Sequence, residues 1–356
     1  MLAALLLAAS VVVSPSPALA QGEAERIDAV VQQHMRGPGA VGLSVAVARG
    51  ETLLYSQGHG FAELEFAANA NDETMFRIGS ITKQFTAAAI LKLAERDKLS
   101  IDDPLTKFLP NYPTHGHEIT LRHLLTHTAG VPSYTDLGPV WERRMAEALS
   151  DAEMLALWQE KPLEFTPGER WKYSNSGYYL LGMVIEKVAG VPYAEFLRDT
   201  FFDPLQLTRT RYDSNEELLL NRAQGYAFES ERFSNDGLLD MRQPGAAGGL
   251  ISSAGDLVKW QLALVGGRAL SKASYEEMTL PFLLASGKET SYGMGLQLDT
   301  QAGKPCVWHG GGINGFNSVL LYFPDEELSI AAISNSERLR ADALGLALAE
   351  ALFATK

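Results

Sequence analysis

The feature that most constrains the fold of this 356-residue chain is where its strand-like and helix-like segments fall. Short apolar runs near the two ends predict five strands, at residues 41–48, 52–56, 307–309, 318–323 and 328–333. Apolar residues with the helical period predict helices at residues 23–36, 81–96, 119–126, 145–159, 178–189, 193–200, 254–264 and 341–353. The strands therefore lie toward the two ends of the chain, and most of the helices lie between them.

This distribution predicts an α+β fold, in which one antiparallel five-stranded sheet is assembled from both termini and a helical lobe is inserted. We place the α/β lobe at residues 21–79 and 291–356 and the helical lobe at residues 80–290. Residues 216–245 are polar and irregular, and we expect them to form a surface excursion beside a cleft.

Charge and cysteine content exclude several classes of partner and site. The formal net charge of −13 argues against nucleic acid as a partner. Cys306 is the single cysteine, so the chain has no intramolecular disulfide and no zinc site built on several thiolates. Because Cys306 lies where a strand is expected to begin, we interpret it as a buried structural side chain rather than a nucleophile.

The first twenty residues are apolar and uncharged, and Ala18-Leu19-Ala20 fits a signal-peptidase site. Residues 14–17 (Ser-Pro-Ser-Pro) interrupt the apolar run, which argues against a membrane anchor. No Lys or Arg precedes the run, which is atypical of a signal peptide. We expect a signal peptide at residues 1–20, an exported protein that is periplasmic or secreted, and no stable membrane span in the mature chain.

Ser80-Ile81-Thr82-Lys83 is the only S-x-x-K sequence in the chain. If Ser80 opens a helix, Lys83 lies one turn away on the same face, where its amine reaches the serine hydroxyl. A partly desolvated lysine loses its proton more easily, and the helix N-terminus favours developing negative charge. These are the requirements of an activated serine nucleophile, although the four-residue pattern is common by chance.

A second candidate is Tyr173-Ser174-Asn175, which precedes an apolar helix. A tyrosine held against a lysine is expected to be stabilised as a phenolate and to shuttle protons, and Asn175 offers a donor and an acceptor to a substrate amide. The alternative is a helix cap at Ser174 or Asn175 with Tyr173 in the core.

The third candidate is Trp308-His309-Gly310-Gly311-Gly312. Glycines after a strand let the backbone approach a ligand closely and present its N–H groups. Two such donors, at Ser80 and Gly312, would form an oxyanion hole. A plain glycine-rich turn is the alternative.

The order of these motifs resembles that of the serine β-lactamase and DD-peptidase superfamily. Tyr173 stands at a position where other branches of the superfamily carry serine. In this respect the chain resembles the branch of class C β-lactamases, D-peptidases and related esterases. Residues 124–130 (Leu-Leu-Thr-His-Thr-Ala-Gly) and 248–254 (Gly-Gly-Leu-Ile-Ser-Ser-Ala) also resemble recurrent stretches of this branch. The resemblance covers nearly the whole mature chain and implies a β-lactamase/transpeptidase-like fold.

The resemblance also implies roles for the site residues. Ser80 would be the nucleophile, Lys83 and Tyr173 the acid/base pair, and the N–H groups of Ser80 and Gly312 the oxyanion donors. Asn175, His309, Gly310 and Gly311 would contact the substrate, a small molecule or a peptide such as one derived from the cell wall. No metal or other cofactor is implied.

One departure from the family pattern concerns the third motif. Most β-lactamases carry Lys-Thr-Gly there, and this chain carries His309-Gly310-Gly311. The fixed cation and the hydroxyl that grip a β-lactam carboxylate are absent. Because histidine titrates near neutrality, we expect His309 to bind carboxylate-bearing substrates better as the pH falls toward 6. Acyl transfer is thus predicted, with D-amino-acid peptides, small esters or amides, and β-lactams as candidate substrates.

Three other interpretations compete with this one. His115-x-His117 and the His123–His127 pair have ligand-like spacing, but neither has the glutamate of an H-E-x-x-H zinc helix. The G-x-S-x-G of a nucleophile elbow is absent. A non-catalytic penicillin-binding-like sensor or binding module on the same fold is the main alternative. The joint presence of Ser80, Lys83 and Tyr173 favours the enzyme.

Overall fold

The structure, a computed structural model, describes the backbone of residues 17–354 and the side chains from Gly22 onward. Residues 1–16 of the expected signal peptide lie outside the described residues. None of the helices in this described part is both long and apolar enough to cross a bilayer.

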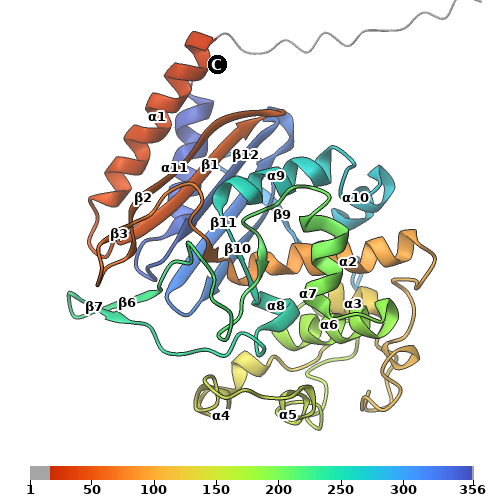
Figure 1. The fold of residues 1–356 in the computed structure, drawn as a ribbon. Coiled ribbons are helices and arrows are strands. Elements are labelled where there is room, and N and C mark those ends of the chain that lie inside the picture. Colours follow the sequence, from red (N-terminus) through yellow and green to blue (C-terminus); the bar gives the residue numbers. More distant parts are fainter. Residues whose placement is uncertain (1–16, 355–356) are drawn as a thin grey trace, which may run out of the picture.

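A seven-stranded antiparallel sheet forms the centre of the α/β lobe, in the order β3-β2-β1-β12-β11-β10-β9 (Figure 1). Its strands are β1 (Gly42–Arg49), β2 (Thr52–Glu63), β3 (Ala68–Asn69), β9 (Gln297–Gln301), β10 (Lys304–Ile313), β11 (Phe316–Phe323) and β12 (Leu328–Ser334). Strand β1, from one end of the chain, pairs with β12 from the other. The α+β class and the sheet built from both ends are confirmed.

The sheet has two more strands than the five expected. The additional strands, β3 and β9, lie at its two edges and read Ala-Asn and Gln-Leu-Asp-Thr-Gln. Short, mostly polar edge strands leave no apolar alternation in the sequence, so the pattern alone did not mark them.

Period-2 alternation divides the side chains of the central strands between two cores. Leu43, Val45 and Val47 of β1 pack on the face covered by helices α1 (Pro17–Met35) and α11 (Ala341–Phe353) (Figure 1). Ala46 and Ala48 point to the opposite face, where their small side chains join the core of the helical lobe. The sheet is thus buried on both faces, and the helical lobe is packed directly against it.

Helix α2 (Thr82–Glu95) is the centre of the helical lobe, and every residue from Thr82 to Leu91 is buried. The other helices of this lobe are α3 (Leu121–Leu125), α4 (Pro139–Glu142), α5 (Asp151–Leu155), α6 (Asn175–Ala189), α7 (Tyr193–Leu197), α8 (Gly245–Gly248), α9 (Ala254–Val265) and α10 (Lys272–Met278). The single helix expected at residues 145–159 is wrong in extent. The Ser150–Glu153 capping box starts α5 at Asp151, and the helix ends after five residues.

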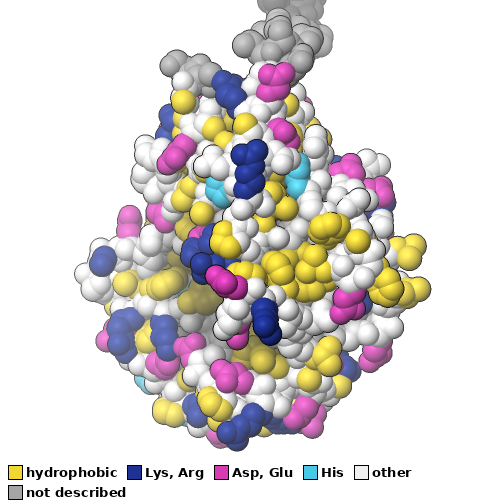
Figure 2. All heavy atoms as spheres, turned by 90° about the vertical axis from the view of Figure 1, so that its left-hand side faces the viewer, with side chains coloured by type: hydrophobic (Ala, Val, Ile, Leu, Met, Phe, Trp, Pro, Cys, Tyr) yellow, Lys and Arg dark blue, Asp and Glu magenta, His cyan; other side chains and the backbone are white. Residues whose placement is uncertain are grey.

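Residues 216–245 form the expected excursion. They include the hairpin of β6 (Tyr226–Glu229) and β7 (Arg232–Asn235), which lies at the left edge of Figure 1. Figure 2 views the molecule from that side and shows hydrophobic side chains gathered near the middle, among basic and acidic ones. A further small sheet joins β4 (Phe76–Arg77), β8 (Leu250–Ser252) and β5 (Arg211–Tyr212) beneath the start of α2.

Candidate active site

Ser80 lies in the 3₁₀ turn Gly79–Ile81, which leads directly into helix α2. Gly79 has φ +48°, in the left-handed region that favours glycine, and a Cβ there would lie 3.0 Å from the backbone of Gly312 in β10. The turn therefore needs glycine both for its conformation and for its close approach to the sheet. The result is that Ser80 is presented where α2 meets β10.

Lys83 follows one turn later and is fully buried. Its Nζ lies 3.1 Å from Ser80 Oγ, 2.7 Å from Asn175 Oδ1 and 2.7 Å from the carbonyl oxygen of Ala247. All three partners are neutral. Burial without a balancing carboxylate lowers the pKa of Lys83 well below its ordinary value, which favours the free amine.

Tyr173 packs beside Lys83, but not in the way the sequence suggested. Lys83 Nζ lies over the tyrosine ring, 4.7 Å from its centroid, and the phenolic hydroxyl hydrogen-bonds to Ser80. Desolvation raises the pKa of Tyr173, and the bond to Ser80 opposes this only in part. The expected phenolate is therefore wrong for the resting protein, in which Tyr173 carries its proton.

Asn175 is the first residue of α6, and its carboxamide is fixed at both ends. Oδ1 accepts from Lys83, and Nδ2 donates to Thr135 Oγ1 at 3.0 Å. The backbone N–H of Asn175 donates to Ser133 Oγ at 3.0 Å. In the resting protein the side chain thus orients the lysine, and a contact of Asn175 with substrate stays a prediction.

Strand β10 supplies the glycines of the third motif, and each meets different surroundings. A Cβ at Gly311 would lie 2.0 Å from the carbonyl oxygen of Ile78 and 2.3 Å from Ser318 Oγ. Ser318 Oγ itself donates to that carbonyl at 2.8 Å. A Cβ at Gly312 would meet no atom within 4 Å. Gly311 therefore lets the strand approach the turn before Ser80, whereas Gly312 borders open space.

His309 is buried in β10, and both of its ring nitrogens are bonded within the protein. Nε2 pairs with the hydroxyl of Tyr292 at 2.9 Å, and Nδ1 with the carbonyl oxygen of Gly310 at 2.6 Å. Desolvation by burial lowers the pKa of His309 to about 3. The expectation that His309 gains a charge near neutrality is therefore wrong, because burial penalises the imidazolium.

A neutral His309 changes the pH dependence that is expected for substrate binding. With a pKa of about 3, His309 stays neutral from pH 5.5 to 8.5. The ratio of KM for a carboxylate substrate to KM for its methyl ester should then be constant over that range, with initial rates as the measurement. A ratio that falls as the pH drops toward 6 would contradict a neutral His309.

The sequence reasoning missed a role for His127, which lies beneath the loop that carries Tyr173. Its ring centroid is 4.2 Å from that of Tyr173, its Nδ1 accepts from the N–H of Ser174 at 3.1 Å, and its carbonyl accepts from Lys172 N at 3.0 Å. His127 also has φ +59°, which is uncommon for a residue with a Cβ. These contacts fix the position of Tyr173, and residues 124–130 were the available signal.

Ser80 lies between two cavities. The first, here called the Trp141 cavity, has a volume of about 320 Å³ and is lined by Ser80 with Tyr134, Trp141, Leu239, Pro244 and Gly312 among others. The second, the Trp308 cavity, has a volume of about 510 Å³ and is lined by Ser80 with Trp171, Tyr173, Trp308, Gly310 and Arg340 among others. Wall residues outside the motifs, such as Trp141, Leu239 and Arg340, are spread along the chain, so no sequence motif marks them.

Two of the four histidines with ligand-like spacing have other roles. His123 caps helix α3 through Nδ1, which accepts from Thr120 N at 3.3 Å, and His127 packs beneath Tyr173. Within residues 17–354 no group of three or more His, Cys, Asp or Glu side chains lies together as a metal site would require. Cys306 is buried in β10, as expected, and burial raises the pKa of its thiol to about 12.

Comparison with known proteins agrees with this geometry. The model of the Beta-lactamase family matches residues 27–355. Penicillin-binding protein 4* of Bacillus subtilis (strain 168) is 31% identical over 309 residues, which cover 83% of this chain and 68% of that protein.

Two solved structures are similar over nearly the whole chain. The octameric penicillin-binding protein homologue from Pyrococcus abyssi has a TM-score of 0.80 at 29% identity, covering 93% of this chain and 77% of that one. The D-amino acid amidase from Ochrobactrum anthropi SV3, in complex with L-phenylalanine amide, has a TM-score of 0.80 at 25% identity, covering 94% and 99%. From its motifs, its fold and these relatives, the chain belongs to the beta-lactamase family and is a serine hydrolase of the β-lactamase fold.

Proposed function

We propose that this protein forms an acyl-enzyme on Ser80 and cleaves amide or ester bonds of small molecules or short peptides. The observation that supports this most is the buried amine of Lys83, 3.1 Å from Ser80 Oγ. A lysine that serves only the fold rarely lies fully buried without a carboxylate partner. A lysine that has to take a proton from serine requires such an environment.

The contacts of Lys83 suit it to act as the base. A neutral amine has two N–H donors and one lone pair. The carbonyl oxygens of Asn175 and Ala247, each 2.7 Å away, accept the two donors, which leaves the lone pair for Ser80. In the proposed step Ser80 Oγ attacks the substrate carbonyl carbon and its proton moves to Lys83 Nζ, while the carbonyl π bond opens to an oxyanion.

Tyr173 is proposed as the acid for the leaving group. Its raised pKa keeps the phenol protonated, and its hydroxyl hydrogen-bonds to Ser80, next to the bond that breaks. As the tetrahedral intermediate collapses, the phenol donates its proton to the leaving oxygen or nitrogen, and Lys83 passes the proton taken from Ser80 to the resulting phenolate. Water then attacks the acyl-enzyme with the same two groups in reverse roles.

The N–H groups of Ser80 and Gly312 are proposed as the oxyanion donors. Both residues line the Trp141 cavity, and the packing of Gly79 against Gly312 brings their backbones together. Donors fixed before the reaction stabilise the developing charge without reorganisation.

The leaving-group side is proposed to be the Trp308 cavity, because Tyr173 lines it. Arg340, which the sequence reasoning missed, also lines this cavity, and Asp342 holds its guanidinium at 2.5 Å. Asp342 lines the same cavity, so a substrate carboxylate would share Arg340 with it. Substrates with a carboxylate on the leaving group, such as cell-wall-derived D-peptides or β-lactams, remain candidates beside small esters and amides.

An active-site phosphonate probe tests the assignment of the nucleophile. The purified wild-type protein should be labelled on the peptide that contains Ser80, whereas Ser80→Ala should remain unlabelled, because it lacks the attacking oxygen. Mass spectrometry of the digested protein gives the modified residue. Labelling of Ser80→Ala would show that another residue is the nucleophile, whereas a fully folded wild type that reacts with no probe and no ester would favour a binding module.

Export is proposed from the apolar leader, with cleavage after Ala20. Protein recovered from a host with an intact secretion pathway should begin at Gln21 by N-terminal sequencing. A soluble cytoplasmic form that begins at Met1 would count against export.

A further inference from the structure

The two cavities at Ser80 differ in charge, and this difference bears on the acyl group of the substrate, provided that the proposed function holds. Tyr173, the proposed proton donor to the leaving group, lines the Trp308 cavity but not the Trp141 cavity. The leaving group therefore lies on the Trp308 side. The acyl group, on the other side of the scissile bond, is left with the Trp141 cavity.

The described residues that line the Trp141 cavity include no Asp, Glu, Lys, Arg or His. Aromatic and aliphatic side chains form much of its wall, including Tyr134, Trp141, Leu239, Pro244 and Ile313. We infer that the enzyme is selective for acyl groups that carry no charge next to the carbonyl carbon: plain or N-acylated acyl groups rather than free amino acids.

Three polar side chains of this wall already have hydrogen-bond partners. Trp141 Nε1 donates to Gln243 Oε1 at 2.8 Å, and the carboxamide of Asn175 is bonded at both ends. The hydroxyl of Thr135 pairs with Ser133 Oγ at 2.8 Å. A substrate ammonium would therefore enter the cavity without a carboxylate to pair with. Burying an unpaired charge is costly.

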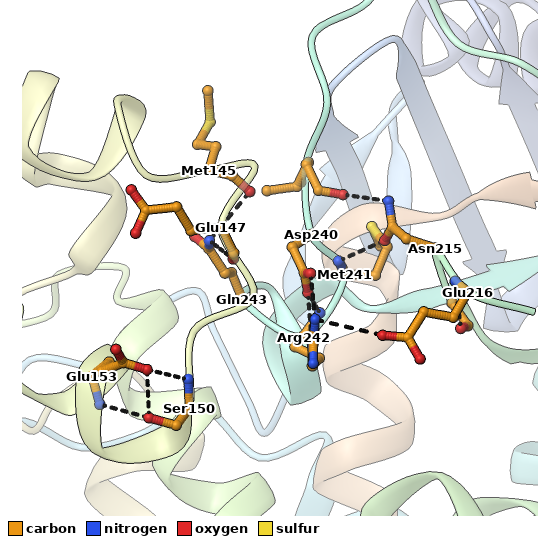
Figure 3. Close-up of polar contacts among 12 residues, drawn as sticks. Met145, Glu147, Ser150, Glu153, Asn215, Glu216, Asp240, Met241, Arg242 and Gln243 are labelled. Atoms are coloured by element: carbon orange, nitrogen blue, oxygen red, sulfur yellow. Dashed lines mark hydrogen bonds and ion pairs between the residues drawn. The ribbon is translucent and has the colours of Figure 1, made fainter.

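The segment that contains Leu239 and Pro244 is held by hydrogen bonds on both sides. Figure 3 shows these hydrogen bonds for the residues that lie between Leu239 and Pro244. Asn215 bonds to the carbonyl of Leu239 at 3.1 Å and to the N–H of Met241 at 3.0 Å. On the other side Gln243 Nε2 donates to the carbonyls of Met145 and Glu147, at 3.2 and 2.8 Å. The wall is thus held in place without a substrate.

The charged side chains of the same segment are paired with one another. Arg242 contacts Asp240 at 2.8 Å and Glu216 at 3.8 Å, and none of these three residues lines the Trp141 cavity (Figure 3). A third cavity shares Leu239 and Asn314 with the Trp141 cavity. This third cavity is lined by charged residues, among them Arg77 and Asp236. A charge on the carbon next to the carbonyl does not extend that far.

This selectivity differs from what the amidase relative suggests. The structure of that protein contains L-phenylalanine amide, in which the carbon next to the carbonyl carries a free amine. For the present chain, the uncharged wall predicts poor use of such amino acid amides.

Matched phenyl esters test the inference, because the leaving group is the same in each. Phenyl (R)-2-methylbutanoate and phenyl D-2-aminobutanoate differ only by a methyl group in place of the ammonium. At pH 6 the kcat/KM of the methyl compound should exceed that of the ammonium compound at least about ten-fold. The N-acetyl derivative of the amino ester should again be cleaved faster than the free amine.

The pH dependence gives a second readout. As the pH rises through the pKa of the ester's own amine, the ammonium becomes neutral. The kcat/KM of the amino ester, divided by that of its methyl isostere, should then rise, while titration of the enzyme cancels in the ratio. Equal kcat/KM for the two esters at pH 6, or a ratio that does not change with pH, would overturn the inference.

A variant in the wall adds a direct test. Leu239→Asp introduces a carboxylate into the Trp141 cavity and should raise the relative kcat/KM of the ammonium ester about ten-fold over the matched Leu239→Asn. Probe labelling of Ser80 in both variants shows that the site is folded. If no ester is cleaved and Ser80 is not labelled in the wild type, the proposed function itself fails. Unselective cleavage with labelled Ser80 refutes only the inference on the acyl group.

Discussion

Replacing Lys83 with methionine is expected to slow acylation of Ser80 by roughly 10²–10⁴-fold, the usual contribution of an acid/base group. Methionine has a similar length and suits the buried position, so the helix should persist. The change removes the only amine within hydrogen-bond distance of Ser80 Oγ among the described residues. The measurement is the single-turnover rate of probe labelling, with thermal unfolding as the check that both proteins are folded.

Lys83→Arg is the matched control for this prediction. Arginine keeps a positive charge and cannot lose its proton at the pH of the assay. If the neutral amine of Lys83 is the base, Lys83→Arg should be as slow as Lys83→Met. An arginine variant that acylates at near the wild-type rate would show that the site needs only a cation, and would refute the role derived from the lowered pKa of Lys83.

Gly311→Ala is expected to have the largest effect on stability of any single glycine change in the third motif. The new Cβ would lie 2.0 Å from the carbonyl oxygen of Ile78, which is backbone and cannot rotate away. Strand β10 would have to separate from the turn that positions Ser80. Overpacking of this kind costs about 1–3 kcal/mol or more. Urea unfolding should show the loss, and labelling of Ser80 should slow in parallel.

Gly310→Ala provides the comparison within the same strand. Its Cβ would meet the Trp308 side chain at 3.6 Å and the carbonyl oxygen of Ser318 at 3.7 Å, which are ordinary contacts. The midpoint of urea unfolding should therefore change little. Equal destabilisation by the two substitutions would show that the strand needs glycine for flexibility, and would contradict the close approach at Gly311.

The secondary structure was predictable wherever a segment has a strong period. Helices α2, α9 and α11 and strands β1, β11 and β12 carry long apolar patterns and occur within a few residues of their predicted places. Edge strands β3 and β9 and the short helix α5 were missed or misplaced, because their lengths and ends depend on neighbouring segments.

The sequence by itself determined that Ser80 and Lys83 share one helical turn, because a spacing of three residues on a helix places two side chains on the same face. It also determined the order of the motifs, and with it the family. Only the tertiary structure decided the protonation states. The partners that orient Lys83 are Asn175 and Ala247, which lie 92 and 164 residues away in the chain.

The same reason explains the two corrections at the site. His309 and Tyr173 were each expected to be charged, because the ordinary pKa of histidine and a nearby lysine suggested it. Burial among residues from several segments instead favours the neutral form of each. Desolvation depends on everything packed around a group, so a sequence motif names the candidate site residues and the fold sets their charges.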